Sequence, residues 1–309
     1  MATPWIPRMH LWEIDDQPWF PSFLRNYVQV ALTHAWTFHL PLLQPGSPAI
    51  LVAAILRRVL GASVSRHTYI DFCAGAGGPT PFIERALNQQ LSASSSSSSP
   101  AAPSYAAVAN PKTKSAAAVD FVLTDLHPNV ESWEAASRQS KHLSYVARPV
   151  DASAAPAELL HQYANKDGKG IFRLFNLAFH HFDDKLARAI LKNTLETSEG
   201  FGIFELQERS ACGFLTCLLF GVLILLIAPF LYWWAPLRLV FVYALPVVPF
   251  VLVFDGIVSA LRTRTPDEVE ALLRTCGADC DGWEMKSGRE RFLWPTGYLN
   301  WVICTKKAI

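Results

Sequence analysis

A glycine-rich turn behind an acid is the first stretch of this chain that could bind a ligand. A strand-like apolar run ends in Asp71, and Gly75, Gly77 and Gly78 follow before a helical pattern begins at Thr80. Glycines let the backbone approach a ligand closely, because no Cβ intervenes. The first amides of the following helix would then face the bound group. The pattern predicts a cofactor loop, although a turn that only joins strand to helix has the same pattern.

The spacing of the glycines separates two classes of cofactor. A dinucleotide loop has a G-x-G-x-x-G pattern, and its third glycine would fall at Thr80. Pro79 also lacks the amide hydrogen that a phosphate cradle would use. Asp71 lies directly before the loop and suits a cationic cofactor better than a diphosphate. An oxidoreductase with a nicotinamide cofactor therefore remains only as the second interpretation.

A second acid follows the next predicted strand. The apolar stretch 119–124 ends at Asp125, and a carboxylate at a strand tip can accept hydrogen bonds from both hydroxyls of a ribose. The Ser-, Ala- and Pro-rich stretch 91–118 cannot form a core and is expected to be a disordered insertion. Without this insertion, Asp125 lies near the ~20-residue interval that nucleoside-binding βαβ units show after the loop.

Two adjacent histidines follow the fourth predicted strand, 170–176. His180 and His181 could take a proton from a nucleophilic acceptor, because imidazole titrates near neutrality. They could also pack beneath a cofactor and move no proton. With Asp183 and Asp184 they suggest a metal site, but the sequence supplies no further ligand at a fitting spacing. No metal is therefore expected.

The composition excludes some classes of protein. A net charge of +1 over 309 residues gives no general attraction to nucleic acid. The six cysteines form no C-x-x-C pair, which indicates reduced thiols in a cytosol-facing protein. The N-terminal residues lack the basic start and apolar centre of a signal peptide. The mean hydropathy of +0.19 is high for a soluble enzyme and comes from one region.

That region is a pair of apolar runs. Residues 213–234 carry no charge, and 22 residues of helix span roughly 33 Å, enough for a bilayer core. The aromatic residues 232–234 end this run as in an interfacial belt. The second run, 239–254, contains Pro246 and Pro249, which would kink it. Two buried core helices are the alternative, but neither run has a polar stripe. The runs predict a membrane-contacting hairpin.

Ordinary globular sequence resumes beyond the hairpin. A capping box at Thr265–Glu268 predicts a helix, and two strand patterns follow at 283–294 and 298–304. If these strands complete the sheet, the chain crosses any membrane an even number of times. The hairpin is then two-pass, re-entrant or interfacial.

The arginines around the hairpin suggest its orientation. Arg209, Arg262 and Arg264 flank its base, against only Arg238 at its tip. This bias favours a cytosolic catalytic domain. The organelle stays open, with the endoplasmic reticulum as a first guess.

Taken in order, these motifs resemble the class I S-adenosylmethionine-dependent methyltransferases. The patterns D-x-C-x-G-x-G-G-P, D-x-x-P-N, W-F-P-x-x-L-R and D-G-x-x-S-x-L-R are similar to a little-characterised, membrane-inserted subgroup. The resemblance implies an α/β fold with a Rossmann-like seven-stranded methyltransferase sheet, an N-terminal helical lid and an inserted apolar helical hairpin. The implied parts are a lid (1–62), a cofactor-binding core (63–210), the hairpin (211–254) and a C-terminal part that completes the sheet (255–309).

The same resemblance implies S-adenosyl-L-methionine as the cofactor. Asp125 would hold the ribose, and Asp151, at the end of a predicted third strand over 143–150, would accept from the adenine amino group. The full set of implied cofactor-binding residues is Asp71, Gly75, Gly77, Gly78, Asp125, Leu126, Asp151 and Asn176. The lid would lie across the crevice, where Glu13, Asp16, Trp19 and Arg25 either touch the substrate or only pack and face solvent.

The expected function is a membrane-attached S-adenosylmethionine-dependent methyltransferase whose acceptor is an apolar small molecule or a lipid. His180 and His181 are its candidate catalytic residues. Its partners would be the bilayer and this acceptor, with no nucleic acid. A membrane-bound NAD(P)-dependent oxidoreductase and a non-catalytic membrane adaptor with the same fold are the alternatives. The atom that receives the methyl group is left open.

Overall fold

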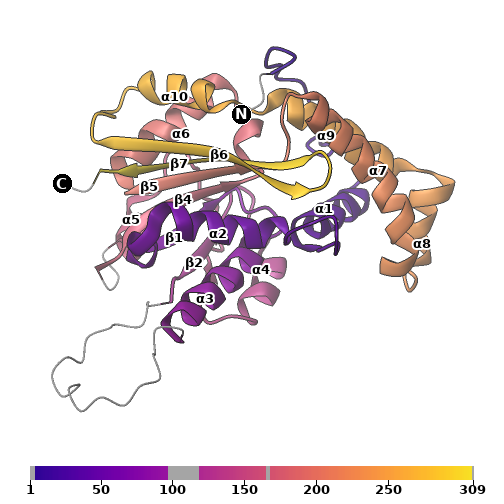
Figure 1. Ribbon diagram of the computed structural model, residues 1–309, viewed down its shortest axis with the longest axis horizontal. Coiled ribbons are helices and arrows are strands. Elements are labelled where there is room, and N and C mark those ends of the chain that lie inside the picture. Colours follow the sequence, from indigo (N-terminus) through magenta and orange to yellow (C-terminus); the bar gives the residue numbers. More distant parts are fainter. Residues whose placement is uncertain (1–3, 97–117, 165–167, 308–309) are drawn as a thin grey trace.

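The computed structural model describes residues 4–96, 118–164 and 168–307, and Figure 1 shows the arrangement of their helices and strands. Most of the insertion predicted over 91–118 lies outside these residues. Its first part was placed wrongly, because helix α3 (Thr80–Ser96) continues through 91–96.

A single seven-stranded sheet organises the molecule, in the order β3-β2-β1-β4-β5-β7-β6. The first five strands pair in parallel, and β7 runs antiparallel to both β5 and β6. The strands are β1 (His67–Phe72), β2 (Phe121–Thr124), β3 (Leu143–Tyr145), β4 (Gly170–Asn176), β5 (Gly200–Glu205), β6 (Trp283–Leu293) and β7 (Gly297–Lys306). This confirms the predicted Rossmann-like methyltransferase sheet, including its two closing strands.

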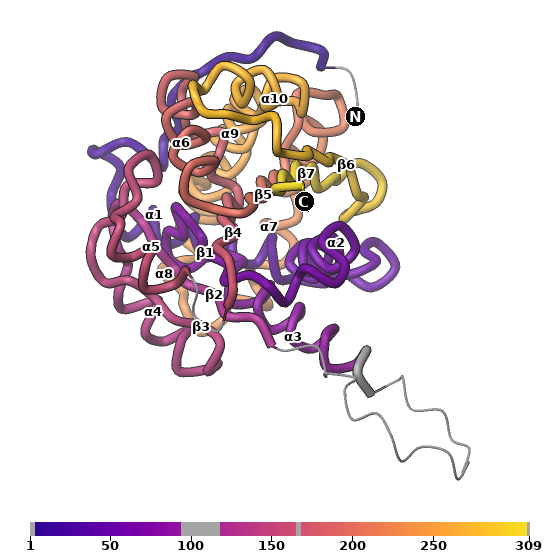
Figure 2. The backbone as a smooth tube through the Cα atoms, turned by 90° about the vertical axis from the view of Figure 1, so that its left-hand side faces the viewer, coloured from indigo at the N-terminus to yellow at the C-terminus, as the bar shows by residue number. Residues whose placement is uncertain are grey.

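Helices cover both faces of the sheet (Figure 2). On one face, α2 (Pro48–Leu60), α3 and α4 (Val130–Ser137) pack in an apolar cluster with β1 and β2. On the other, α5 (Ala157–Tyr163), α6 (Asp184–Thr197) and α10 (Pro266–Arg274) form a second cluster. The predicted capping box of α10 is present, since Thr265 and Glu268 bond each other's backbone amides. Because helices cover both faces, the crevice beyond the carboxyl ends of the parallel strands is the place where a ligand can bind.

Two local predictions need correction. The third strand ends at Tyr145 rather than at 150, because Pro149 cannot donate to a ladder and Arg148 is exposed. Within the predicted helical lid (1–62), α1 (Ser22–Thr37) and α2 are helical, whereas residues 11–21 form an irregular strap. Pro18 and Pro21 stand in this strap and favour its non-helical course.

The apolar hairpin extends from the end of the sheet that carries the loops after β4 and β5. It consists of α7 (Ala211–Leu231), α8 (Pro236–Leu239), the π-helical turn η4 (Val240–Ala244) and α9 (Val247–Arg262). α7 and α9 approach closely at two glycines. A Cβ at Gly221 would lie 2.4 Å from Val253, and one at Gly256 would lie 3.2 Å from Cys217. Helix α9 continues to Arg262, past the predicted hairpin end at 254.

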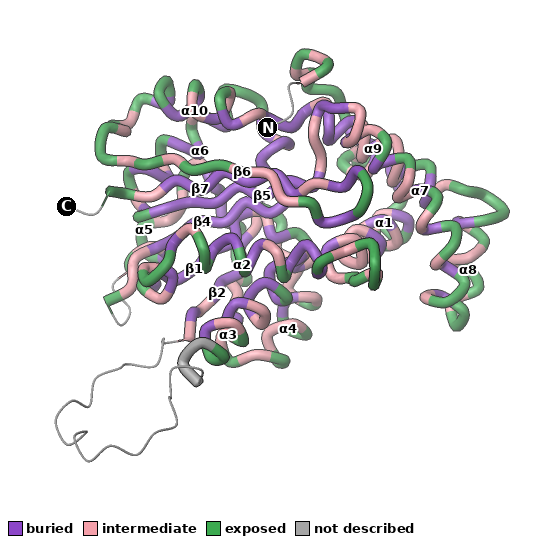
Figure 3. The backbone as a smooth tube through the Cα atoms, viewed as in Figure 1, coloured by how far each residue is buried: buried purple, intermediate pink, exposed green. Residues whose placement is uncertain are grey.

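The outer face of α7 carries a stripe of exposed apolar side chains. Its members recur every three or four residues, with Leu225 and Leu226 adjacent, and are Leu215, Leu218, Val222, Leu225, Leu226 and Phe230, followed by Trp233 and Trp234. Figure 3 shows α7 at the right with buried, half-buried and exposed residues along its length. Within the described residues, two helical segments are long and apolar enough to cross a membrane, α7 and Pro48–Arg66. The bent pair Pro236–Ala244 and Val247–Arg262 meets the same test as one unit, with a 64° bend.

The arginines at the hairpin base do not present free charge to a membrane surface. Arg209, Arg262 and Arg264 are all buried. They form ion pairs with Glu268, with Glu13 and with Asp184, respectively. The predicted orientation therefore loses its electrostatic support and remains a prediction.

Candidate functional site

One large cavity lies at the carboxyl ends of the parallel strands. Its volume is about 920 Å³, and it reaches from the loop after β1, past the loop after β4, to helices α1, α7 and α9. Pockets for one small molecule usually occupy about 300–1,000 Å³. This cavity lies near the top of that range, so it has room for a cofactor and part of a second ligand.

The glycine loop forms the first wall of the cavity. Gly75 and Gly78 line it with φ angles of 52° and 47°, a left-handed conformation that glycine adopts without strain. Gly77, with φ 100°, lies under the loop, where a Cβ would contact Trp133 at 3.7 Å. Thr80 is the first residue of α3, and its hydroxyl donates to Asp71.

Asp125 is held in place beside this loop. Its Oδ2 accepts from the Gly75 amide at 2.8 Å, and its Oδ1 accepts from the His127 amide at 2.8 Å. A carboxylate offers about four lone-pair positions, so two remain for a ligand. Asp125 lines the cavity, and its oxygens could receive a diol there.

Asp71 lies beneath the loop and does not line the cavity. It is 1% exposed and accepts hydrogen bonds from Thr80 and, at 3.4 Å, from the Asn176 amide. Burial raises the pKa of Asp71 to about 7, against the lowering effect of these two donors. Asn176 itself reaches the cavity. Asp71 thus braces the loop through Thr80 and Asn176, and its predicted contact with a cofactor is indirect at most.

Two further predicted cofactor residues lie outside the cavity. Leu126 is 52% exposed, and Asp151 is exposed and accepts from the amide and hydroxyl of Ser153. Leu126 follows the end of β2, as predicted, whereas β3 ends at Tyr145, well before Asp151, and both residues lie at the surface. Their predicted roles find no support in this geometry.

The two histidines also line the cavity and follow β4, the strand that pairs with β1. They stand in the short helix η3 (Phe179–His181) after β4, with ring centroids 4.3 Å apart. Glu205, at the tip of β5, accepts from the His180 backbone amide at 3.2 Å and from its Nδ1 at 2.8 Å. His181 directs its Nδ1 to Asp16 at 3.2 Å.

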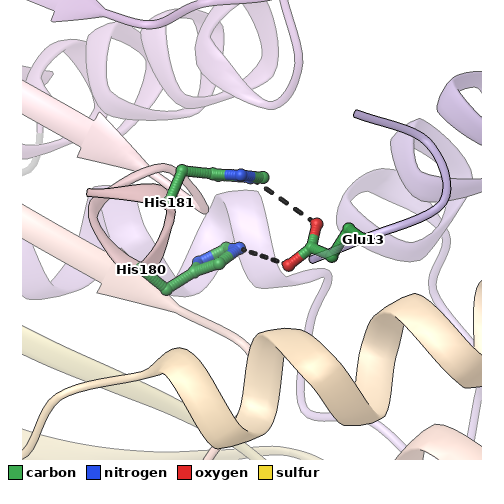
Figure 4. A group of neighbouring side chains, drawn as sticks. All are labelled: Glu13, His180 and His181. Atoms are coloured by element: carbon green, nitrogen blue, oxygen red, sulfur yellow. Dashed lines mark ion pairs between the residues drawn. The ribbon is translucent and has the colours of Figure 1, made fainter. Parts of the chain in front are cut away.

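Glu13 from the strap completes this cluster (Figure 4). Its carboxylate oxygens lie 3.7 Å from Nε2 of His180 and 3.9 Å from Nε2 of His181. Glu13 is thus a further potential metal ligand beside the histidines, which the sequence did not reveal because Glu13 is distant in the sequence and adjacent in space. Glu13, His180 and His181 form a group that could hold a metal ion.

Helix α9 fastens the strap over the cavity. Asp255 accepts from the amides of Ile14 and Asp15 at 2.7 and 2.9 Å. Ser259 donates to Glu13 at 2.9 Å, and Arg262 pairs with Glu13 at 2.9 Å. These are the polar positions of the D-G-x-x-S-x-L-R motif, whose spacing places them on one helix face. The motif is visible in the sequence, but its contacts with the strap are not.

Two neighbouring acids of the strap, Asp15 and Asp16, have pKa values that are shifted in opposite directions. Burial raises the pKa of Asp15 to about 7, although Arg25 acts against it. Burial also acts to raise the pKa of Asp16, but the hydrogen bond and charge of His181 outweigh it and lower that pKa to about 2. Glu13, Asp16 and Arg25 line the cavity as the lid hypothesis requires. Trp19 is 65% exposed and lies outside the lining.

The sheet order, the glycine loop and the acid at the tip of β2 together define the fold of class I methyltransferases. No family model and no curated protein matches the chain. Similar solved structures include an S-adenosylmethionine-dependent methyltransferase from Anabaena variabilis ATCC 29413, with 14% identity, a TM-score of 0.44, and coverage of 91% of this chain and 93% of that chain.

Two other similar structures were solved with S-adenosylhomocysteine (SAH). The plantazolicin methyltransferase BamL has 11% identity and a TM-score of 0.45, with 93% of this chain and 99% of that chain covered. An O-methyltransferase from Bacillus cereus has 11% identity and a TM-score of 0.39, with 95% and 94% covered. At these identities the likeness concerns the fold alone, and the strand order and directions carry the assignment.

Proposed function

We propose that this chain is a membrane-attached S-adenosylmethionine-dependent methyltransferase that acts on an apolar small molecule or a lipid-like acceptor. The observation that carries the proposal is the continuity of one cavity. Its polar end is formed by the glycine loop and Asp125, and its apolar end is formed by the hairpin.

The polar end suits the cofactor. A sulfonium nucleoside has a ribose diol for Asp125 and a cationic centre that negative charge stabilises. The left-handed glycines let the backbone lie against it. Pro79 and the missing third glycine disfavour a diphosphate at the same place.

The apolar end suits a greasy acceptor. Leu223, Ile227 and Leu231 of α7 line it together with Val28 of α1 and Leu252 of α9. These side chains offer few hydrogen-bond partners, so a polar ligand would lose hydration there without compensation. An acyl or polyisoprenoid chain would instead gain about 25 cal/mol for each Å² that leaves water.

The reaction needs the acceptor atom to attack the sulfonium methyl group in line. Catalysis would then come mainly from holding the two reactants in that orientation. An acceptor with an ionisable proton must also lose it. His180 is the best-placed base, because Glu205 holds its Nδ1 hydrogen and leaves the Nε2 lone pair for the acceptor. His181 lies beside it.

The hairpin supports the membrane part of the proposal. Soluble monomers seldom expose contiguous apolar patches larger than a few hundred Å². The stripe on α7 continues into the exposed tryptophans 233 and 234, whose amphipathic rings suit a membrane interface. An acceptor dissolved in the bilayer would reach the cavity between α1 and α7.

Equilibrium binding of SAH and of NADPH to the purified full chain in detergent tests the proposal. We expect SAH to bind. Asp125→Ala should weaken it about 10- to 100-fold, because hydrogen bonds to a charged group contribute about 1.5–3 kcal/mol. Glu131→Ala, which removes an exposed acid from nearby α4, is the matched control and should leave the affinity unchanged.

The other outcomes separate the alternatives. Binding of NADPH instead of SAH would favour the oxidoreductase. Binding of neither would favour the non-catalytic adaptor. Mass spectrometry of lipids that copurify with the chain would identify the acceptor class, and an acceptor that is water-soluble throughout would contradict the apolar-acceptor part.

A further inference from the structure

Three side chains from two segments, the strap and η3, converge at the wall of the cavity that the histidines form. One carboxylate oxygen of Glu13 and one ring nitrogen each of His180 and His181 lie within 4.8 Å of one another. Figure 4 shows both rings directed at the carboxylate, which enters from the strap between them and α9. Glu13 and His180 are buried, and His181 is open to the cavity.

Each histidine is oriented by its own carboxylate. Glu205 accepts from Nδ1 of His180 at 2.8 Å, and Asp16 lies 3.2 Å from Nδ1 of His181. Ionised carboxylates only accept hydrogen bonds, so each of them can hold the Nδ1 hydrogen of its ring. An ion would then bind at Nε2 of each ring, and both Nε2 atoms face Glu13. A carboxylate behind each imidazole is the arrangement that orients histidines on metal ions.

The local charge also calls for a cation. Glu13, Glu205 and Asp16 lie against the two rings, and Asp255 binds the strap amide of Ile14, the residue after Glu13. Arg262 is the guanidinium that contacts this group. Arg262 approaches one oxygen of Glu13 at 2.9 Å, while the other oxygen lies toward His181. One guanidinium does not balance four carboxylates, and buried charges in proteins are paired or bind metals.

We propose that Glu13, His180 and His181 bind one divalent transition-metal ion. Two imidazoles and a carboxylate suit zinc, iron(II), cobalt and manganese. Ligands about 2.1 Å from one ion lie about 3–3.5 Å apart. The two Nε2 atoms lie 3.7 and 3.9 Å from different oxygens of Glu13. One oxygen and one nitrogen of each ring lie within 4.8 Å of one another, so the side chains would close in by up to about 1–2 Å on the ion.

Three protein ligands leave positions of the ion open toward the cavity. Under the proposed function, an oxygen atom of the acceptor would occupy one of them. The ion would then replace His180 in favouring loss of the acceptor's proton, because the Nε2 lone pair of His180 would bind the ion. That role rests on the proposed function, whereas binding of the ion does not.

Metal titration of the full chain tests this inference. The detergent-solubilised protein is stripped with a chelator, then titrated with Zn²⁺, Mn²⁺ and Co²⁺ by calorimetry, with visible absorption recorded for Co²⁺. We expect one ion per chain for at least one metal and Co²⁺ bands of a nitrogen- and oxygen-bound ion. His181→Ala and Glu13→Gln should each weaken binding at least 10-fold. His161→Ala on α5, an exposed histidine outside the cluster, should change nothing.

A second variant keeps the ligands and changes only their support. Asp16→Asn should weaken binding about 10-fold, since loss of the partner that orients a ligand typically costs 10- to 100-fold in affinity. Less than one ion per chain with every metal would overturn the proposal, as would equal binding by the parent, His181→Ala and Glu13→Gln proteins. SAH binding in the same samples separates the two ideas. If the protein binds metal but not SAH, the metal site stands and the methyltransferase proposal fails. If it binds SAH but not metal, the methyltransferase proposal stands and the metal site fails.

Discussion

The two ends of the cavity are built in different ways. The polar end, where we propose that the cofactor binds, is called the cofactor end below. It consists of strand tips, left-handed glycines and hydrogen bonds such as those of Asp125 with Gly75 and of Asp71 with Thr80. The hairpin end consists of apolar side chains from helices that meet only in the folded chain, α1, α7 and α9. The cofactor end is polar and is built around one strand-turn-helix segment, β1 to α3. The hairpin end is apolar and is formed by helices that lie far apart in the sequence. Each should therefore respond to a different kind of change.

The largest expected effect concerns the exposed stripe at the hairpin end. Leu218, Leu226 and Phe230 are 50%, 64% and 80% exposed. Aspartate costs about 2.5–3.5 kcal/mol at the centre of a spanning helix. The triple variant Leu218→Asp, Leu226→Asp, Phe230→Asp should therefore lose membrane association by several orders of magnitude in vesicle flotation, while SAH binding in detergent persists.

The control lies on the other segment that is apolar enough to span. Ile50 on α2 is 47% exposed, but the opposite face of α2 is buried against the sheet. Ile50→Asp should leave flotation unchanged. If Ile50→Asp releases the protein and the triple variant does not, then α2 is the membrane element and the comparison is reversed.

A smaller effect is expected from the buried acid at the cofactor end. The pKa of Asp71 is raised to about 7 by burial, above the ordinary value of 3.8 that the unfolded chain shows. Between these values the folded state holds the extra proton, so stability should fall as pH rises from about 4 to about 7. At 1.36 kcal/mol per pKa unit the loss approaches about 4 kcal/mol. Denaturant unfolding in detergent across this pH range measures it.

Asp71→Asn imitates the protonated acid and should remove the part of this slope that Asp71 contributes. The slope that remains should be that of Asp15, whose pKa burial also raises to about 7, and the variant should exceed the parent in stability at pH 8. Asp279→Asn, at an exposed acid, should retain the parent's slope. A slope that is unchanged in Asp71→Asn would show that Asp71 is ionised throughout.

The smallest effect concerns the strap that ties the two ends together. Asp255→Asn leaves one acceptor oxygen where two now bind the amides of Ile14 and Asp15. Loss of one such bond costs about 1–1.5 kcal/mol, which corresponds to roughly 5- to 10-fold faster amide exchange in the strap. The affinity for SAH should stay within twofold. A larger change would show that the two ends are coupled through the strap.

The sequence predicted the cofactor end better than the histidine cluster. The strand, turn and helix around Gly75 are encoded by neighbouring residues, as is the capping box of α10, so both could be recognised locally. The hairpin was visible because an uncharged helical run of that length is rare. The two closing strands were predicted from the resemblance to the methyltransferase sheet.

Other features depend on distant contacts. His181 meets Asp16 across a separation of 165 residues, and no local pattern shows that the strap would arrive there. Leu126 and Asp151 follow predicted strands in the sequence, but the paths of their loops decide which way they face. Helix α2 and α7 both pass a test of length and hydropathy, and only packing shows that one is half inside the core and the other largely exposed.

The interruption of the sheet by the hairpin has a consequence for biosynthesis. Strand β7 lies between β5 and β6, yet it leaves the ribosome after α7 and α9. At 5–20 residues per second, several seconds separate β5 from the strand that covers its open edge. During that interval the apolar helices are already made, while the sheet and the cavity at its end are incomplete. Under the proposed function, delivery to the bilayer would therefore precede completion of the cofactor site.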